Sequence, residues 1–363
     1  MSEDVESYLD EFASLWRGAK LHEERDEAGL LETLVSSEAV FALADRIAQA
    51  NVRQMLSANK RASERKKLRT GFERRLRKRW GKALTLFDEA VDYSHDLGAA
   101  FCRENEAGAA AEQDLRFEAL RRLHARSCAI AWEIHALLSS GHADGATARW
   151  RSLYEIAVVA VLLSNEDVDL SNRFLLHEIV VTAGNSADYA LYGEKAGLEP
   201  QDEEDRERIQ RTSAGLVERF GKSYRQRPYG WAAGIFEGQA PGLRQLAEKV
   251  NLTQWYPLWN AASDQLHGGS KGAAGTLVSR GPQTYLKSGP TNVGLGEPAE
   301  AALVALGNVT AALTLCRQTG KPRYLVGNRV LHWLADEAGA AFVAAHEKLE
   351  SDERRIWEGD ASG

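Results

Sequence analysis

The sequence predicts an all-α protein built as a helical bundle. Three observations indicate this: Ala, Leu, Glu and Arg dominate the composition, only 8 of the 363 residues are proline, and β-branched runs are rare. Apolar residues make up 44% and charged residues 27%, as in an ordinary globular protein with a sizeable core.

We expect three parts along the chain. Residues 1–110 form an N-terminal helical region, residues 111–320 a helical core domain, and residues 321–363 a C-terminal helix and tail. Gly108 and the alanines around it mark the first boundary. No internal repeat at a fixed period is present.

The N-terminal region is expected to be helical throughout. A short acidic helix covers residues 5–15, and Ser37 is placed to cap a second helix that runs to about residue 56. A strongly basic helix follows over residues 60–82, and a further helix over residues 83–97 is expected to end at Gly98. The basic helix carries apolar residues at helical spacing, which indicates that it packs on one side. These residues are Leu68, Phe72, Leu76 and Trp80.

The core domain and the C-terminal part are also read as helices. Ser171 is the expected N-cap of one helix, and Pro257 fits the first turn of another. An aromatic loop covers residues 224–234, and a small β-hairpin is expected near residues 276–287. The predicted helices span residues 112–138, 144–163, 171–192, 201–220, 257–267, 298–317 and 328–349.

The charge of the chain is unevenly distributed. The net charge is −7, but residues 60–82 hold twelve basic residues against Glu64 and Glu73, so this segment carries +10 and the rest carries −17. Two interpretations remain open: the basic helix contacts the phosphates of RNA or a nucleotide, or it docks on a partner protein or on the acidic body of the chain. The candidate phosphate contacts are Arg74, Arg75, Arg77 and Lys78.

Composition also bears on compartment and cofactors. Cys102, Cys128 and Cys316 are far apart and form no CxxC motif, which argues against a disulfide framework and a zinc site. The N-terminus lacks an apolar signal segment, and the longest apolar run, residues 156–163, is shorter than the ~20 residues of a membrane span. We therefore expect a cytoplasmic protein with no membrane association, no metal and no cofactor.

A polar stripe runs along the otherwise apolar helix at residues 144–163. Asp144, Thr147, Arg151 and Glu155 fall within roughly 80° of one another at helical spacing. Arg151 precedes Glu155 by four residues, the weaker order for a surface ion pair. The stripe is interpreted either as part of an active site or as a buried Arg–Glu pair that fixes helix register.

A second stripe lies on the helix that begins near Pro257. Asn260, Ser263, Asp264 and His267 share one face. Asp264 and Ser263 are placed to reach the imidazole, and a neighbouring carboxylate would raise its pKa, as a general acid or base requires. A structural histidine near a helix C-terminus has the same pattern.

Weaker motifs follow these stripes. The segment 268–272 offers backbone N–H groups and Lys271 to a phosphate, although it also fits a connecting loop. His177 and Glu178 suggest metal chemistry only superficially, because Val181 stands where a second histidine would complete HExxH.

Together these motifs resemble the bacterial domain of unknown function number 5677 over about residues 115–316. That family pairs a Gly-rich turn and an Arg-x-Leu-x-Glu helix with a Tyr-Gly-Trp loop and a later Ser-x-x-x-His. The resemblance implies an α-helical cytosolic bacterial protein and no established activity. The matching residues are Gly141, Gly145, Arg151, Leu153, Glu155, Tyr229, Gly230, Trp231, Ser263 and His267.

More distantly, the layout is similar to the helical bundles called HEPN. Many of these are metal-independent ribonucleases of toxin–antitoxin and phage-defence systems, and they often form homodimers. Their signature places an Arg four to six residues before a His, where this chain has Asn260, Ala261 and Ala262. The resemblance implies an RNA- or nucleotide-acting protein in defence or stress response. In this sequence, Arg151 of a neighbouring helix is the candidate for the cation that is missing before His267.

Three functional hypotheses result, and the third is a nucleic-acid-binding protein that works through the basic helix alone. In the first, His267 is general base or acid, Asp264 orients it, Arg151 stabilises phosphorane charge and Glu155 orients Arg151. Substrate contacts would come from Ser263, Asn260, Lys271 and the basic helix. In the second, the chain is a non-catalytic protein-interaction module, and the same Arg–Glu and Asp–His groups form a buried structural network.

Overall fold

The computed structural model describes residues 38–57, 59–266, 269–280, 283–317 and 322–360. Contacts divide the chain into two units, residues 1–72 and 73–363. This division differs from the three predicted domains, whose boundaries remain predictions. In the smaller unit, helix α3 (Glu38–Ser57) confirms the second predicted helix, while its predicted cap and the helix at residues 5–15 lie outside the described residues.

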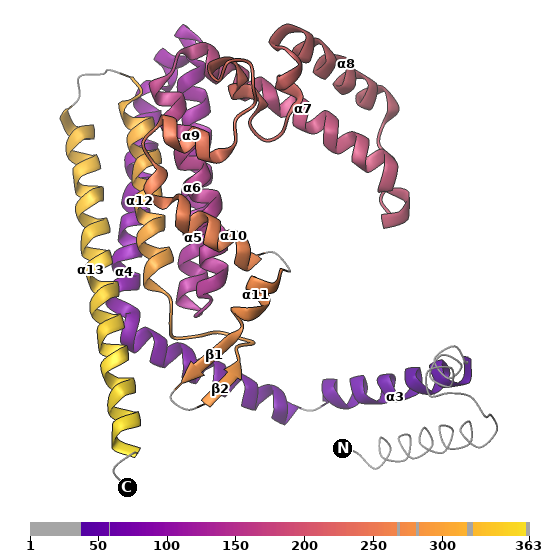
Figure 1. Ribbon diagram of the computed structural model, residues 1–363, viewed down its shortest axis with the longest axis vertical. Coiled ribbons are helices and arrows are strands. Elements are labelled where there is room, and N and C mark those ends of the chain that lie inside the picture. Colours follow the sequence, from indigo (N-terminus) through magenta and orange to yellow (C-terminus); the bar gives the residue numbers. More distant parts are fainter. Residues whose placement is uncertain (1–37, 58, 267–268, 281–282, 318–321, 361–363) are drawn as a thin grey trace. The chain divides into compact units, whose positions relative to one another are not determined.

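The larger unit confirms the all-α prediction. Its long helices run side by side (Figure 1). Rings and polar side chains join α4 to three of them: Phe101 contacts Phe117 of α5 and Tyr324 of α13, and Ser94 contacts Thr310 of α12. The bounds are α4 (Asn59–Glu112), α5 (Leu115–Ser139), α6 (Ala143–Asn165), α12 (Gly296–Leu315) and α13 (Pro322–Asp360).

Shorter elements cover the ends and one side of these helices. The predicted hairpin is present: Leu277 pairs with Leu286, and Val278 with Tyr285, in an antiparallel register. Two short helices were not predicted: α9 lies in a segment to which no element was assigned, and α11 overlaps the segment 268–272 that was interpreted as a loop. The bounds are α7 (Val168–Tyr192), α8 (Glu203–Phe220), α9 (Leu243–Lys249), α10 (Tyr256–Leu266), α11 (Ser270–Ala274), β1 (Leu277–Arg280) and β2 (Gln283–Leu286). Short 3₁₀ turns lie at 194–196, 222–225, 230–235 and 253–255.

Helix α6 is the central element of the core. It packs against α5, α12 and α10, and its tryptophan, Trp150, is fully buried. The turn before it is left-handed at Gly141, and the Gly141 carbonyl accepts a hydrogen bond from Thr291 N over 2.8 Å. Because α6 is covered on several sides, the polar side chains of its half-buried stripe, Arg151 and Glu155, lie close enough to other elements to contact them.

The predicted helix end at Gly98 is wrong. Helix α4 continues through Gly98 to Glu112. A Cβ atom at Gly98 would lie 2.2 Å from Cε1 of His124, so the glycine lets the α5 imidazole approach the α4 backbone. The prediction that the apolar stripe of the basic segment is packed holds for only part of it. Leu76 and Trp80 are buried, whereas Leu68 is 74% exposed.

A buried polar cluster joins α4, α5 and α12 at this contact. Ser94 Oγ lies 2.8 Å from Thr310 Oγ1 and 3.4 Å from His124 Nε2. Cys128 Sγ also lies within 3.9 Å of Ser94 Oγ. Burial lowers the pKa of His124 to about 4, so the imidazole is neutral in the folded protein near pH 7.

Two further helices, α7 and α12, can be compared with the sequence predictions. Helix α7 begins earlier than predicted, because Asp167 and not Ser171 caps it: Asp167 Oδ1 accepts a hydrogen bond from Asp169 N over 2.8 Å. Helix α12 is apolar enough and long enough to fit a membrane span by composition alone, and 67% of that stretch is buried by the rest of the fold. The predicted location in the cytoplasm remains a prediction.

Replacing Gly98 by Ala is expected to destabilise the protein, because the new methyl group displaces the His124 ring. We expect a loss of about 2 kcal/mol in urea unfolding, although Ala gains up to about 1 kcal/mol in helix propensity. The control is Gly215→Ala in α8, where nothing lies within 4 Å of the new Cβ. If Gly98→Ala is as stable as this control, the close contact is wrong.

His124 is expected to make the protein less stable as the pH falls. The unfolded chain binds a proton on this imidazole near pH 6.5 and the folded chain only near pH 4, so between these values the unfolded state holds more protons. Between about pH 7.5 and pH 5, wild type should lose about 2 kcal/mol more than His124→Gln in urea unfolding. The exposed His346→Gln should behave as wild type, and an equal loss in His124→Gln would contradict the account.

Candidate functional site

The polar stripe on α6 joins this helix to several different neighbours. Asp144 Oδ2 lies 2.5 Å from Lys287 Nζ, just after the hairpin. Thr147 Oγ1 donates to the carbonyl of Ala143 within its own helix over 3.0 Å. The next two positions, Arg151 and Glu155, reach α10 and the aromatic loop. Three charged residues of the stripe thus connect α6 to other elements. We call this set the α6 seam: Asp144, Arg151 and Glu155.

Arg151 stacks on an aromatic ring of α10. Its Cζ lies 4.5 Å from the centroid of the Trp259 ring, and Trp259 in turn stacks on Tyr256 with ring centroids 5.5 Å apart. A guanidinium over an indole is a favourable cation–π geometry. The Nε of Arg151 is buried and has no hydrogen-bond partner within the described part of the chain.

Glu155 binds the aromatic loop. Tyr229 Oη donates a hydrogen bond to Glu155 Oε1 over 2.6 Å. Burial, together with the Glu155 charge, raises the pKa of Tyr229 far above its usual value, so the phenol keeps its proton and remains a donor. Gly230 allows this placement, because a Cβ there would lie 2.6 Å from the Ser223 carbonyl oxygen.

The predicted pairing of Arg151 with Glu155 is wrong. Among the described residues, no ion pair within 4.0 Å joins the two side chains, and each has a partner from a different element. The geometry explains this outcome: α10 covers the stripe at Arg151, and the loop covers it one turn later at Glu155. Glu155 accepts a hydrogen bond from Tyr229, and its predicted role in orienting Arg151 remains a prediction.

The second predicted stripe is described only in part. On α10, Asn260 is exposed, Ser263 is half-buried and Ala262 is buried on the opposite side. The side chain of Asp264 and all of His267 lie outside the described residues. The stacking of Trp259 on Arg151 places this helix against α6, while the predicted Asp264–His267 pair and its catalytic role remain predictions.

The aromatic loop rests on α7. Tyr224 is buried, its hydroxyl donates to the Arg173 carbonyl over 2.7 Å, and its own carbonyl accepts a hydrogen bond from His177 Nε2 over 2.9 Å. Burial lowers the pKa of His177, which keeps the imidazole neutral. His177 thus anchors the loop that carries Tyr229.

The other predicted contacts lie elsewhere. Lys271 is exposed on α11 and has an interaction partner. In the described part of the chain, no group of three His, Cys, Asp or Glu side chains is arranged to hold a metal ion.

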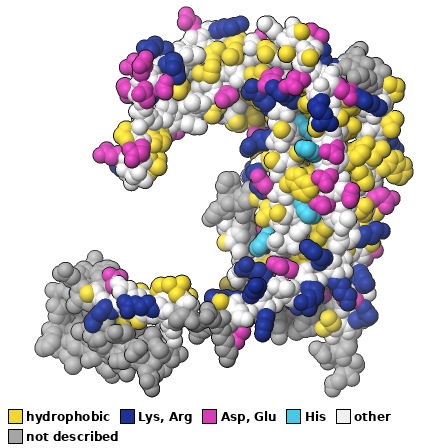
Figure 2. Space-filling view, turned by 180° about the vertical axis from the view of Figure 1, so that it is seen from behind, with side chains coloured by type: hydrophobic (Ala, Val, Ile, Leu, Met, Phe, Trp, Pro, Cys, Tyr) yellow, Lys and Arg dark blue, Asp and Glu magenta, His cyan; other side chains and the backbone are white. Residues whose placement is uncertain are grey.

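The basic segment of α4 presents a cationic face in the larger unit. Leu76 and Trp80 point into the core, and cations occupy the opposite side of the helix at i, i+4 and i+8 spacing. Lys and Arg side chains gather around the lower end of the larger unit in the space-filling view (Figure 2). We call the exposed set the α4 cationic face: Arg74, Arg75, Arg77, Lys78 and Lys82.

Comparison with known families identifies the segment that contains the seam. Residues 117–283, from the first turn of α5 to the start of β2, match a family model. This segment is similar to the family of unknown function DUF5677. The DUF5677 segment includes Arg151, Glu155, Tyr229 and Trp259, and it excludes the α4 cationic face and α13. Neither the curated proteins nor the solved structures gave a match to the chain.

Two residues that contact the α6 seam were missed as site residues. Tyr229 was placed in an aromatic loop and Trp259 among core aromatics, and neither was assigned to Arg151 or Glu155. No sequence spacing indicates these contacts, since Tyr229 lies 74 positions after Glu155. The sequence offered one indication of these contacts: two charges on a half-buried stripe, and a Tyr-Gly-Trp loop whose polar groups would need partners if buried.

Removing the Tyr229 hydroxyl should destabilise the fold, because Glu155 then loses its donor. We expect Tyr229→Phe to lower the free energy of unfolding by roughly 1–2 kcal/mol in urea titrations. Tyr285→Phe, which changes an exposed tyrosine on β2, should have little effect. Equal stability of the two variants would show that the Tyr229–Glu155 bond does not support the fold.

Proposed function

We propose that this chain is a helical RNA-acting protein that binds RNA through the α4 cationic face. The observation that carries the proposal is the exposure of five cations, Arg74 to Lys82, none of which has an acidic partner within 4.0 Å in the described part of the chain. Their neighbour Arg79 differs, because its Nη2 lies 2.8 Å from Asp352.

The arrangement of these cations suits a phosphate backbone. Arg74, Lys78 and Lys82 follow one another along one side of the helix, with about 6 Å between successive Cβ atoms. Among the described residues, no carboxylate lies within 4.0 Å of these five side chains, so the face has a local excess of positive charge. Such a face attracts polyanions and loses affinity as salt releases their counterions.

The more specific part of the proposal is that the chain cleaves the bound RNA, as HEPN ribonucleases do, in defence or stress response. In that step His267 removes or supplies a proton and Asp264 orients it, while the Arg151 guanidinium stabilises charge on the phosphorane. Two observations support this role for Arg151: its position beside α10, and its Nε, which has no hydrogen-bond partner among the described residues. Glu155 binds Tyr229, and its role in orienting Arg151 remains a prediction.

A second candidate function is a non-catalytic interaction module. The observation that favours it is the α6 seam, in which Arg151 and Glu155 both have partners that hold the fold together. Under this alternative, the α4 cationic face contacts an acidic protein and His267 is dispensable.

The test is binding of a single-stranded RNA to the full chain at several salt concentrations. Reversing three cations in Arg74→Glu/Arg75→Glu/Lys78→Glu should weaken binding at least about tenfold and reduce the log–log salt slope by about 2. The matched control, Arg206→Glu/Arg208→Glu/Arg211→Glu on α8, changes the net charge equally, and its arginines are paired with acidic neighbours.

The outcomes separate the candidates. Equal loss in both triple variants, or no RNA binding by wild type, contradicts the proposal. Binding to anionic lipid vesicles without binding to RNA also contradicts it. Analysis of the same RNA for cleavage tests the proposed catalytic step. Wild type should cleave the RNA in the presence of a chelator, and His267→Ala should not. Intact RNA with both proteins would contradict cleavage and leave RNA binding as the proposed function.

A further inference from the structure

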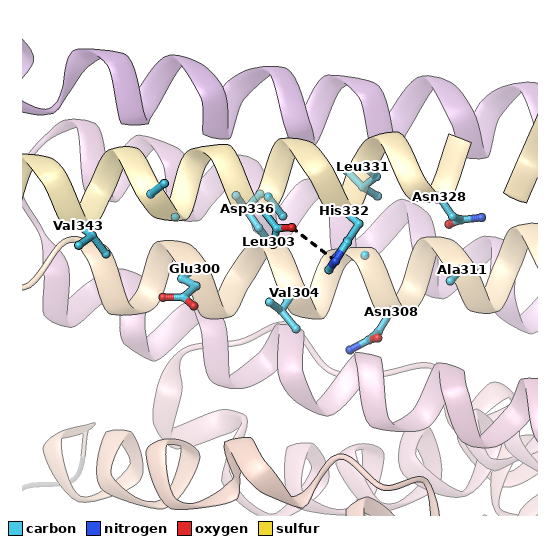
Figure 3. Close-up of a pocket in the computed structure, with 14 residues that line it drawn as sticks. Glu300, Leu303, Val304, Asn308, Ala311, Asn328, Leu331, His332, Asp336 and Val343 are labelled. Carbon is cyan, nitrogen blue, oxygen red and sulfur yellow. Dashed lines mark ion pairs between the residues drawn. The ribbon is translucent and has the colours of Figure 1, made fainter. Parts of the chain in front are cut away.

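A groove separates the outer faces of α12 and α13. It has a volume of about 520 Å³, and small residues line much of it, among them Gly307, Ala311 and Ala335. Figure 3 shows Asn308 of α12 on one side and His332 and Asp336 of α13 on the other, with His332 Nε2 3.5 Å from Asp336 Oδ2. Small residues between two helices leave room for the side chains of a further helix.

Helix α13 also exposes apolar side chains beside the groove. Val326 is 61% exposed, Trp333 is 56% exposed and Val343 is 53% exposed. The opposite side of α13 faces the core through Leu331 and Phe342. A helix with apolar residues on its inner and outer sides is typical of one that is covered on both.

Eight residues on the exposed side of α13 share one face of the helix, because they lie three and four positions apart. Four of them are apolar or small and four are charged. Within the described part of the chain, Arg329 and Glu347 on this face have no ion pair within 4.0 Å. We call it the α13 stripe: Val326, Arg329, Trp333, Asp336, Ala340, Val343, Glu347 and Glu350.

Charge along α13 is divided between its two halves. Residues 322–335 hold Arg323 and Arg329 and no acidic residue, while residues 336–350 hold four acidic residues and one lysine. Two parallel copies of the stripe would place Arg329 against Arg329 and Glu347 against Glu347, which is unfavourable. Two antiparallel copies instead bring opposite charges together, and a two-fold axis generates both contacts at once.

We propose that a second copy of this chain docks antiparallel along the α13 stripe. With the two-fold axis beside residue 338, Arg329 lies opposite Glu347 of the second copy and Trp333 lies opposite Val343. The same register places Asp336 opposite Ala340, where the small side chain permits close approach. Asp336, Ala340 and Val343 also line the groove, so the Trp333 indole of the second copy enters it.

This interface is independent of the RNA-binding proposal, because it lies on α13 and not on α4. The test is the mass of the full chain in solution, measured by light scattering and sedimentation without RNA. Wild type should be a dimer, and Trp333→Glu a monomer with an unchanged helical spectrum. The control Leu191→Glu, at an exposed apolar position of α7, should remain a dimer.

A charge swap tests the register, and it does not depend on whether Trp333→Glu folds. Arg329→Glu alone should weaken dimerisation roughly tenfold, since two symmetric contacts change from attraction to repulsion. Adding Glu347→Arg should restore it. A monomeric wild type, a dimer that Trp333→Glu leaves intact, or a double variant no better than the single one overturns the proposal.

Discussion

The burial of α6 is the constraint on which the rest of this structure depends. The helix is covered by α5, α12 and α10, yet it carries ionisable groups on one stripe. Charges in such a position are costly unless other groups satisfy them. Three other parts of the chain supply partners: Lys287 after the hairpin pairs with the exposed Asp144, Trp259 of α10 stacks on the half-buried Arg151, and Tyr229 of the aromatic loop donates to the half-buried Glu155. The hairpin segment, α10 and the aromatic loop are thereby fixed to the core at successive turns of one helix.

The charged residues of the α6 seam differ in surroundings from those of the α4 cationic face. The charges of the α6 seam lie inside the DUF5677 segment and are used between elements. The charges of the α4 cationic face lie outside that segment and face solvent. An exposed cation with no acidic partner among the described residues contributes little to stability. The two proposals of function therefore rest on different residues.

The sequence predicted the helices well, because their apolar spacing and helix-favouring composition act locally. It also predicted the hairpin, whose turn residues are local signals. It failed at Gly98, where a helix-ending residue instead admits His124 from α5. It failed again at Arg151 and Glu155, which were paired by their i, i+4 spacing. Tyr229 and Trp259 come from distant segments, and only tertiary packing determines such contacts.

The most direct test of the account is cross-linking of bound single-stranded RNA to the full chain, with the sites mapped by mass spectrometry. The account predicts cross-links in residues 73–82 of α4, and none in α8, where the arginines Arg206, Arg208 and Arg211 are paired with acidic neighbours. Cross-links that avoid residues 73–82, or that follow cationic residues equally over the whole surface, would contradict it.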